Sequence, residues 1–223
     1  MQPGDELPLQ DQDWYRFRQL SQLGNHWERP GWAYGRRSYH WLLTFKHSPD
    51  LHALAGQCQA PFRDLPQFDL VPLDTLHLTL HRLAFTDELP PSRLPAVVAA
   101  VRQRCRDLAA LRLRIGWLAG STGAIRFTAL PVEPIVEVHN VVRAQSARVH
   151  QTVPACVSDG FWPHVSIAYS NSAQPAAPIA ATVEALRSLP PAEVLVTSLV
   201  LVELRREGRA YWWEVLERVG IGE

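Results

Sequence analysis

Hydrophobic and polar residues alternate in several short stretches of the chain, which is the pattern of half-buried strands. The clearest is DTLHLTLHRLAF, residues 74–85, where leucine fills positions 76, 78 and 80. His77, Thr79 and His81 occupy the positions between the leucines, on the other face of the expected strand. Similar runs predict strands at 38–45, 68–83 with a bend near FDLVPL, 111–120, 124–132, 160–170 and 193–219, the last divided by a turn at Glu207-Gly208.

Segments in which apolar residues recur at helical spacing lie between these strands. Residues 92–110 place aliphatic side chains on one helical face and arginines opposite. Ser48 and Pro49 resemble a helix start, and further helices are expected at 50–59, 132–149 and 178–188. Helices mixed with hairpins predict an α+β fold with antiparallel pairing. The order of elements also has a two-part rhythm.

The chain of 223 residues suits one large domain or two closely packed lobes. Residues 1–37, rich in Trp, Arg, Gly and Pro, are expected to form an irregular lead docked on the body. Residues 38–223 are expected to form a single bilobed domain.

Composition narrows the class of protein. A formal net charge of zero disfavours a protein that grips long nucleic acid through many phosphates, and favours a small ligand or one end of a polymer. No apolar run is long enough for a membrane helix, and the acidic N-terminus lacks the apolar core of a signal peptide. The three cysteines, at positions 58, 105 and 156, have no CxxC spacing, so we expect reduced core residues in the cytoplasm.

Two of the expected strands carry His-x-Thr/Ser followed by an aliphatic residue. One contains His77 and Thr79, and the other contains His164 and Ser166, 87 residues later. In a strand, side chains two residues apart share a face, so each strand would deliver one imidazole and one hydroxyl into the same space. A third match at His150 runs into Pro154 and is interpreted as chance.

Such a pair of imidazoles suits cleavage of a phosphoester without a metal ion. One neutral imidazole can deprotonate the attacking oxygen, and one protonated imidazole can protonate the leaving oxygen. The hydroxyls of Thr79 and Ser166 can donate to non-bridging phosphate oxygens. The opposing interpretation is that both histidines are satisfied core residues.

The stretches LHLTL and FWPHVSIAY resemble the two signature motifs of the 2H phosphoesterase superfamily, which includes 2′-5′ RNA ligase-like proteins and 2′,3′-cyclic nucleotide phosphodiesterases. The resemblance covers about residues 38–217. It implies two antiparallel sheets around a pseudo-twofold axis, with His77 and His164 as the catalytic pair in a central cleft and Thr79 and Ser166 binding phosphate. The chain departs from the family at HRLAF after the first motif, and at Tyr169 after the second.

Five further residues are candidate substrate contacts: His81, His40, Tyr169, Arg126 and Trp32. His81 could rim the cleft or meet solvent. A solvated sheet face competes with a cleft role for His40 and Arg126, and docking of the lead competes with base stacking for Trp32. The two histidines of H-x-x-x-H, at positions 77 and 81, would be about 13 Å apart on a strand, too far for one metal ion.

The aromatic residues of the lead include Tyr34, which with Arg36 and Arg37 could form a wall for bases and phosphates or pack on the body. In the run Tyr211-Trp212-Trp213, alternate rings must face opposite ways, so one set is core and the other could stack on a nucleobase.

We therefore expect a monomeric enzyme without cofactor, metal or membrane association. Its partner would be an RNA end or small nucleotide bearing a 2′,3′-cyclic phosphate, which it would hydrolyse or, in reverse, ligate. An RNA- or nucleotide-binding module with the same cleft and little catalysis is the main alternative, and a zinc hydrolase is a third.

Overall fold

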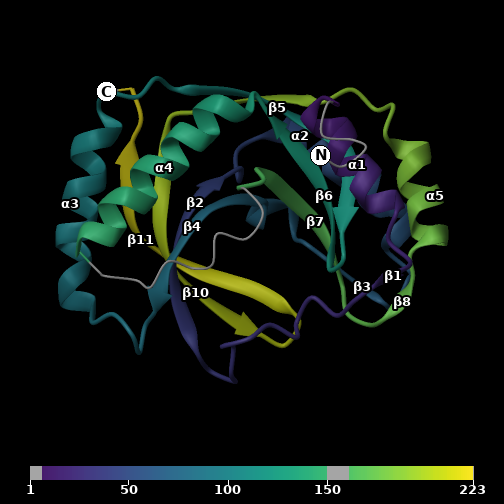
Figure 1. Ribbon diagram of the computed structural model, residues 1–223, viewed down its shortest axis with the longest axis horizontal. Coiled ribbons are helices and arrows are strands. Elements are labelled where there is room, and N and C mark those ends of the chain that lie inside the picture. Colours follow the sequence, from purple (N-terminus) through teal and green to yellow (C-terminus); the bar gives the residue numbers. More distant parts are fainter. Residues whose placement is uncertain (1–6, 150–160, 223) are drawn as a thin grey trace.

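Two antiparallel sheets form the centre of the molecule (Figure 1). A computed structural model describes residues 7–149 and 161–222. The four-stranded sheet has the order β11 (Ala210–Gly220), β10 (Ser198–Glu207), β2 (Arg37–Thr44) and β4 (His77–Phe85). The five-stranded sheet has the order β3 (Phe68–Leu70), β7 (His164–Ser170), β6 (Ala124–Leu130), β5 (Leu111–Ser121) and β9 (Ala192–Val196). A short ladder joins β1 (Gln22–Leu23) to β8 (Gln174–Pro175).

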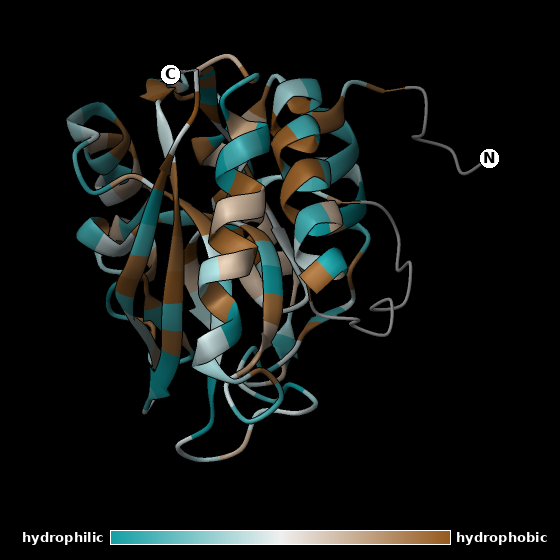
Figure 2. Cartoon of the chain, turned by 90° about the vertical axis from the view of Figure 1, so that its left-hand side faces the viewer, coloured by the Kyte–Doolittle hydropathy of each residue, from teal (hydrophilic) through white to brown (hydrophobic). Residues whose placement is uncertain are grey.

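Helices pack on both sheets. The described helices are α1 (Leu9–Arg18), α2 (Pro49–Gln59), α3 (Leu94–Cys105), α4 (Val132–Val149) and α5 (Ala177–Leu186). The pair α3 and α4 packs on the four-stranded sheet, while α1, α2 and α5 contact the five-stranded sheet. Hydrophilic and hydrophobic bands alternate along these elements (Figure 2), as expected when one face of each is buried. No helix in the described ranges is long and apolar enough to cross a bilayer.

One hydrophobic core joins the two sheets. It contains Trp41 and Leu78 from the four-stranded sheet, together with Ile125 and Val165 from the five-stranded sheet. A second, smaller cluster lies on the opposite face of the four-stranded sheet. Its buried members are Leu42, Val200, Val202 and Leu204, and Trp32, Tyr211 and Trp213 pack against them. The smaller cluster marks the face that turns toward the pocket described below.

The expected α+β class with antiparallel sheets is confirmed. Pro49 begins α2 as expected, although the Ser48 side chain makes no capping hydrogen bond. Gly208, at a φ of 57°, occupies the predicted turn between β10 and β11. Cys58 and Cys105 are buried free thiols, whereas Cys156 and His150 lie outside the described residues.

Two elements differ from the expectation. The supposedly irregular lead contains α1, which begins after Pro8 without a side-chain cap and is rich in polar residues, so it carried no start signal and only a weak periodic one. Its Phe17 packs where Gly120 on β5 leaves room, because a Cβ there would overlap the ring. The apolar run after residue 192 is also divided, since it leaves the five-stranded sheet at Val196 and enters the four-stranded sheet at Ser198.

Candidate active site

Strands β4 and β7 begin with His77 and His164, and the two strands contact each other between the sheets (Figure 1). Their pairings with neighbouring strands are equivalent. His77 lies opposite Thr44, and His164 lies opposite Thr128. Two residues further on, Thr79 lies opposite Leu42 and Ser166 lies opposite Arg126. The structure therefore places each imidazole and its hydroxyl on one face of their strand.

Each imidazole is held by a backbone carbonyl two residues earlier. Nδ1 of His77 lies 2.9 Å from the carbonyl oxygen of Thr75, and Nδ1 of His164 lies 2.7 Å from that of Trp162. A carbonyl oxygen can only accept, so in both rings Nδ1 carries the hydrogen and donates it. The other ring nitrogen, Nε2, then remains for proton exchange with a ligand.

Burial favours the neutral form of both rings. It lowers the pKa of His164 to about 3, and the positive charge of Arg126 acts in the same direction. Burial also lowers the pKa of His77, although the Thr75 carbonyl opposes that shift. The charge of His77 contributes to the lowered pKa of His164, as expected for two rings that share one site.

A β-bulge interrupts each histidine strand at the same place. In β4 the register skips Leu80 between Thr79 and His81, and in β7 it skips Ile167 between Ser166 and Ala168. A bulge inserts one residue and reverses the alternation beyond it. Arg82 and Tyr169, five residues after their histidines, therefore join the face that carries the histidines.

The structure separates His81 from this face. It lies opposite the core residue Trp41, and its ring centroid is 6.4 Å from that of His139 on α4. Strict alternation leaves the role of His81 open between cleft rim and solvent, but the bulge at Leu80 turns this residue toward α4. In the described ranges, no group of three or more His, Cys, Asp or Glu residues is arranged to hold a metal ion.

His40 lies on the histidine face, opposite Arg82. Its Nε2 is 2.6 Å from the hydroxyl of Ser38, and its buried Nδ1 has no hydrogen-bond partner. Burial, reinforced by the charges of Arg82 and other neighbours, lowers the pKa of His40 to about 3. His40 is thus a neutral, partly unsatisfied group at the base of this face.

Arg126 lies opposite Ser166 but already has a partner. It donates to a carboxylate oxygen of Asp13 on α1 at 2.5 Å, and Thr128 donates to the other oxygen at 3.2 Å. Asp13 is only 1% exposed, so this is a buried ion pair. The structure thus ties Arg126 to the lead, although its charge still acts on His164.

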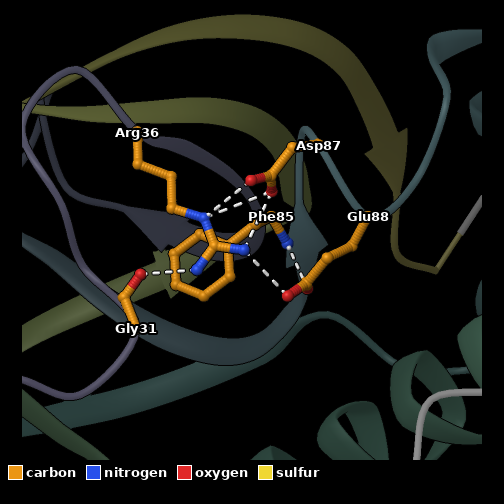
Figure 3. Close-up of polar contacts among 5 residues, drawn as sticks. All are labelled: Gly31, Arg36, Phe85, Asp87 and Glu88. Carbon is orange, nitrogen blue, oxygen red and sulfur yellow. Dashed lines mark hydrogen bonds and ion pairs between the residues drawn. The ribbon is translucent and has the colours of Figure 1, made fainter.

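Trp32 and Arg36 attach the lead to the body. Trp32 packs on the smaller hydrophobic cluster and contacts the Phe85 ring at 5.3 Å between centroids. Arg36 stacks 3.5 Å above Phe85 and donates to Asp87, Glu88 and the carbonyl of Gly31 (Figure 3). These contacts support packing of the lead rather than phosphate binding by Arg36. Tyr34 is fully exposed, and Arg37 pairs with Glu203 at 2.8 Å.

Tyr169 belongs to an aromatic group that also includes residues of the lead. The His26 ring stacks on Tyr169 at 3.9 Å between centroids, and its Nε2 lies 2.9 Å from the hydroxyl of Tyr211. Nη2 of Arg29 donates to Nδ1 of His26 at 3.1 Å, so Nε2 carries the hydrogen and donates to Tyr211. Burial, aided by nearby arginines, lowers the pKa of His26 to about 2, which keeps the ring neutral in this chain of contacts.

His26 and Arg29 were not predicted from the sequence. Both stand in a Gly- and Pro-rich stretch with no periodic pattern, so their spacing gave no signal. Arg29 nevertheless lies near enough to His164 and His40 to lower the pKa of each. The lead therefore contributes charge and aromatic surface to the site.

A narrow pocket opens beside His77 between the sheets. Its polar and aromatic walls include His77, Tyr169, Tyr211 and Trp213, and its apolar side comes from residues 70–72. The Trp213 ring contacts the His77 ring edge-on, with 5.0 Å between centroids. Trp212 points to the other face of β11 and is 45% exposed.

Solved structures share this fold. A structure of LigT from E. coli with NADP+ has a TM-score of 0.62 and 15% identity, covering 84% of this chain and 99% of that one. A LigT complex with 3′-AMP has a TM-score of 0.62 and 14% identity, with the same coverage. TT0787 of Thermus thermophilus has a TM-score of 0.63 and 22% identity, covering 84% of this chain and 98% of that one.

Sequence comparison adds the family. No curated protein matches the sequence significantly. The profile described as the 2′-5′ RNA ligase superfamily matches residues 48–208, which is most of the chain and includes both histidine motifs. This match supports an enzyme of the phosphoesterase or RNA ligase kind, and we conclude that the chain belongs to the 2′-5′ RNA ligase superfamily.

Proposed function

We propose that the protein hydrolyses 2′,3′-cyclic phosphates of RNA ends or small nucleotides, using His77 and His164 as a paired general acid and base without a metal ion. The observation that carries the proposal is the matched state of the two rings. Each Nδ1 is bound to a backbone carbonyl, and each ring shares its strand face with a hydroxyl. Neutral and protonated imidazole can together perform both proton transfers of the reaction.

The reaction balances with these groups and water. Nε2 of His164 takes a proton from water as the water oxygen bonds to phosphorus. The bond from phosphorus to the 3′-oxygen breaks, and Nε2 of His77 gives its proton to that oxygen. The product is a 2′-phosphate, and solvent later returns the proton from His164 to His77. The hydroxyls of Thr79 and Ser166 would donate to the non-bridging oxygens as charge develops there.

The causes of the two pKa shifts support this assignment. The pKa of His164 is lowered to about 3, so its ring is a neutral acceptor across the physiological range. The carbonyl contacts favour the protonated form of both rings, but burial and then the positive charges of Arg126 and Arg29 lower the pKa of His164, whereas burial is what lowers the pKa of His77. A bound phosphate anion would oppose the effect of burial and raise the pKa of His77 toward the value that a general acid needs. By microscopic reversibility, the same groups would serve 2′-5′ ligation.

The test is replacement of each histidine. His77→Ala and His164→Ala should each reduce turnover of a 2′,3′-cyclic mononucleotide by at least 100-fold, about the lower range for loss of a general acid or base. His81→Ala is the matched control, because this ring on the same strand lies toward α4. Circular dichroism would verify folding, and EDTA should leave the wild-type rate unchanged. Full activity in either folded histidine variant would refute the mechanism.

A binding module with little catalysis is the second candidate function. It is favoured by the lowered pKa of both histidines, which disfavours a protonated acid, and by the pairing of Arg126 with Asp13. This candidate predicts that nucleoside 2′-monophosphates bind, measured by calorimetry, while no cyclic phosphate is turned over. Turnover that depends on both histidines would exclude it.

A further inference from the structure

Two arginine side chains place positive charge beside His164, and a carboxylate balances only one of them. The charges of Arg126 and Arg29 both lower the pKa of His164, in addition to the effect of burial. Arg126 forms a buried ion pair with Asp13. In residues 7–149 and 161–222, by contrast, no carboxylate lies within ion-pair distance of Arg29. The charge of Arg29 is therefore available to an anionic ligand.

Hydrogen bonds hold the Arg29 guanidinium without neutralising it. Its Nε donates to the carbonyl oxygen of His26 at 3.2 Å, and its Nη2 donates to Nδ1 of the same residue at 3.1 Å. The His26 ring is neutral, because burial and nearby arginines lower its pKa to about 2. These two contacts leave Nη1 and the second hydrogen of Nη2 for another acceptor. The two terminal nitrogens of a guanidinium can together bind two oxygens of one phosphate.

The anchor of Arg29 places its charge between the two sheets. The His26 ring stacks on Tyr169 at 3.9 Å between centroids, and Tyr169 lies on the histidine face of β7. The charge of Arg29 reaches His164 on the five-stranded sheet and also His40 on the four-stranded sheet. Since both rings lie on the faces that carry the catalytic candidates, Arg29 lies near the place where the reacting phosphate would bind.

Arg29 belongs to a part of the chain that the family profile does not cover. The profile matches residues 48–208, and Arg29 and its anchor His26 precede that range. Arg29 is also exposed, so water can solvate its charge until a ligand replaces the water. An exposed arginine by itself indicates nothing. The fixed orientation, the missing carboxylate and the position between the sheets together indicate a ligand.

We propose that Arg29 is a further catalytic residue, whose free N–H groups bind non-bridging oxygens of the reacting phosphate between His77 and His164. This inference rests on the proposed function and adds a cation from the lead to it. A 2′,3′-cyclic phosphate carries a single negative charge. The transition state gains a second negative charge as His164 takes the proton of the attacking water. Arg29 therefore stabilises the transition state more than the bound substrate.

Arg29→Gln tests the proposal, because it removes the charge and keeps a side chain that can donate to His26. Its kcat for a 2′,3′-cyclic mononucleotide should fall roughly 100- to 1,000-fold, the range for losing one donor to a developing oxyanion, and KM should rise by a smaller factor. Arg37→Gln is the matched control, since it makes the same change in an exposed arginine that pairs with Glu203. It should change kcat by less than about twofold. Equal losses in the two variants, or no loss in Arg29→Gln, would overturn the inference.

A structural role for Arg29 predicts different results. The midpoint of urea unfolding should be the same for Arg29→Gln and the wild-type protein, because the side chain is exposed and pairs with no carboxylate in the described part of the chain. Arg29→Lys keeps the charge but not the two-armed guanidinium, so it should recover part of the lost kcat. A lowered midpoint, together with equal kcat values for Arg29→Lys and Arg29→Gln, would assign Arg29 to structure and refute the catalytic role.

Binding of inorganic phosphate separates this inference from the proposed function. By calorimetry, the wild-type protein should bind phosphate at least about 10-fold more tightly than Arg29→Gln, the factor expected for losing a hydrogen bond between charged groups. Arg37→Gln should bind phosphate as the wild-type protein does. If His77→Ala and His164→Ala keep full turnover while this difference is found, the proposed mechanism fails and the anion site at Arg29 stands. Equal phosphate affinities of Arg29→Gln and the wild-type protein would refute the anion site, whatever the turnover.

Discussion

Single residues set the protonation states on which the site depends. His26, His40 and His164 are deeply buried, and each has a pKa lowered to about 2 or 3. In the unfolded chain they would titrate near their ordinary value of about 6.5. Between the folded and unfolded pKa values, the unfolded state binds more protons than the folded state. The free energy of unfolding therefore decreases as the pH falls.

This difference predicts the pH dependence of stability. The stabilising effect is fully present above about pH 6.5 and is lost as the pH falls toward about 3. Three such groups give a slope of at most about 4 kcal/mol per pH unit in the free energy of unfolding. Urea unfolding at about pH 7.5 and about pH 5.5, on either side of the ordinary histidine pKa, would measure it, and His40→Gln should make the slope shallower. Equal stability at both pH values would contradict the buried, neutral state of these rings.

Secondary-structure elements explain why the sequence located the two catalytic candidates but not all their neighbours. Alternation assigns His77 and Thr79 to one face because they precede the bulge. Beyond Leu80 the bulge reverses the pattern, and nothing in the local sequence marks it. The interpretation of His81 failed to include α4 for this reason, and Arg82 was missed.

The helix α1 provides a test at the same scale. Asp13→Ala should destabilise the protein by about 3–5 kcal/mol, because it leaves the largely buried guanidinium of Arg126 without its partner. Asp11→Ala is the matched control on the same helix. Its ion pair with Arg187 is half exposed on the acidic side, so we expect a change of about 1 kcal/mol or less. Denaturant titration measures both changes in the free energy of unfolding. Equal changes would show that the buried ion pair contributes no more to stability than the exposed one.

At the scale of the whole molecule, the two lobes, each formed by one sheet and the helices that pack on it, share one core. The sequence predicted the fold class because alternation and helical spacing survive in most elements. It could not show that the run after residue 192 passes from one sheet to the other, since both parts are buried and apolar. Nor could it show that the lead reaches the site, because the contacts of His26 and Asp13 join positions more than 100 residues apart.

A shared core predicts that the lobes unfold together. Cys58 lies on α2 and Cys105 on α3, in different lobes, and burial raises the pKa of each thiol to about 11. In variants that keep one of these cysteines at a time, a thiol reagent should label both positions at the same urea concentration. Labelling of one well before the other would indicate lobes that unfold independently.

The carbonyl contacts of His77 and His164 have a consequence for how the protein can vary. In many enzymes a second side chain orients the catalytic imidazole, and losing that side chain disables it. Here the orienting group is a backbone carbonyl from the residue two positions before each histidine. Every amino acid carries such a carbonyl. Substitutions at Thr75 or Trp162 cannot delete it. Substitutions around the two rings therefore leave their tautomer unchanged, and the proposed chemistry is compatible with extensive sequence divergence around the site.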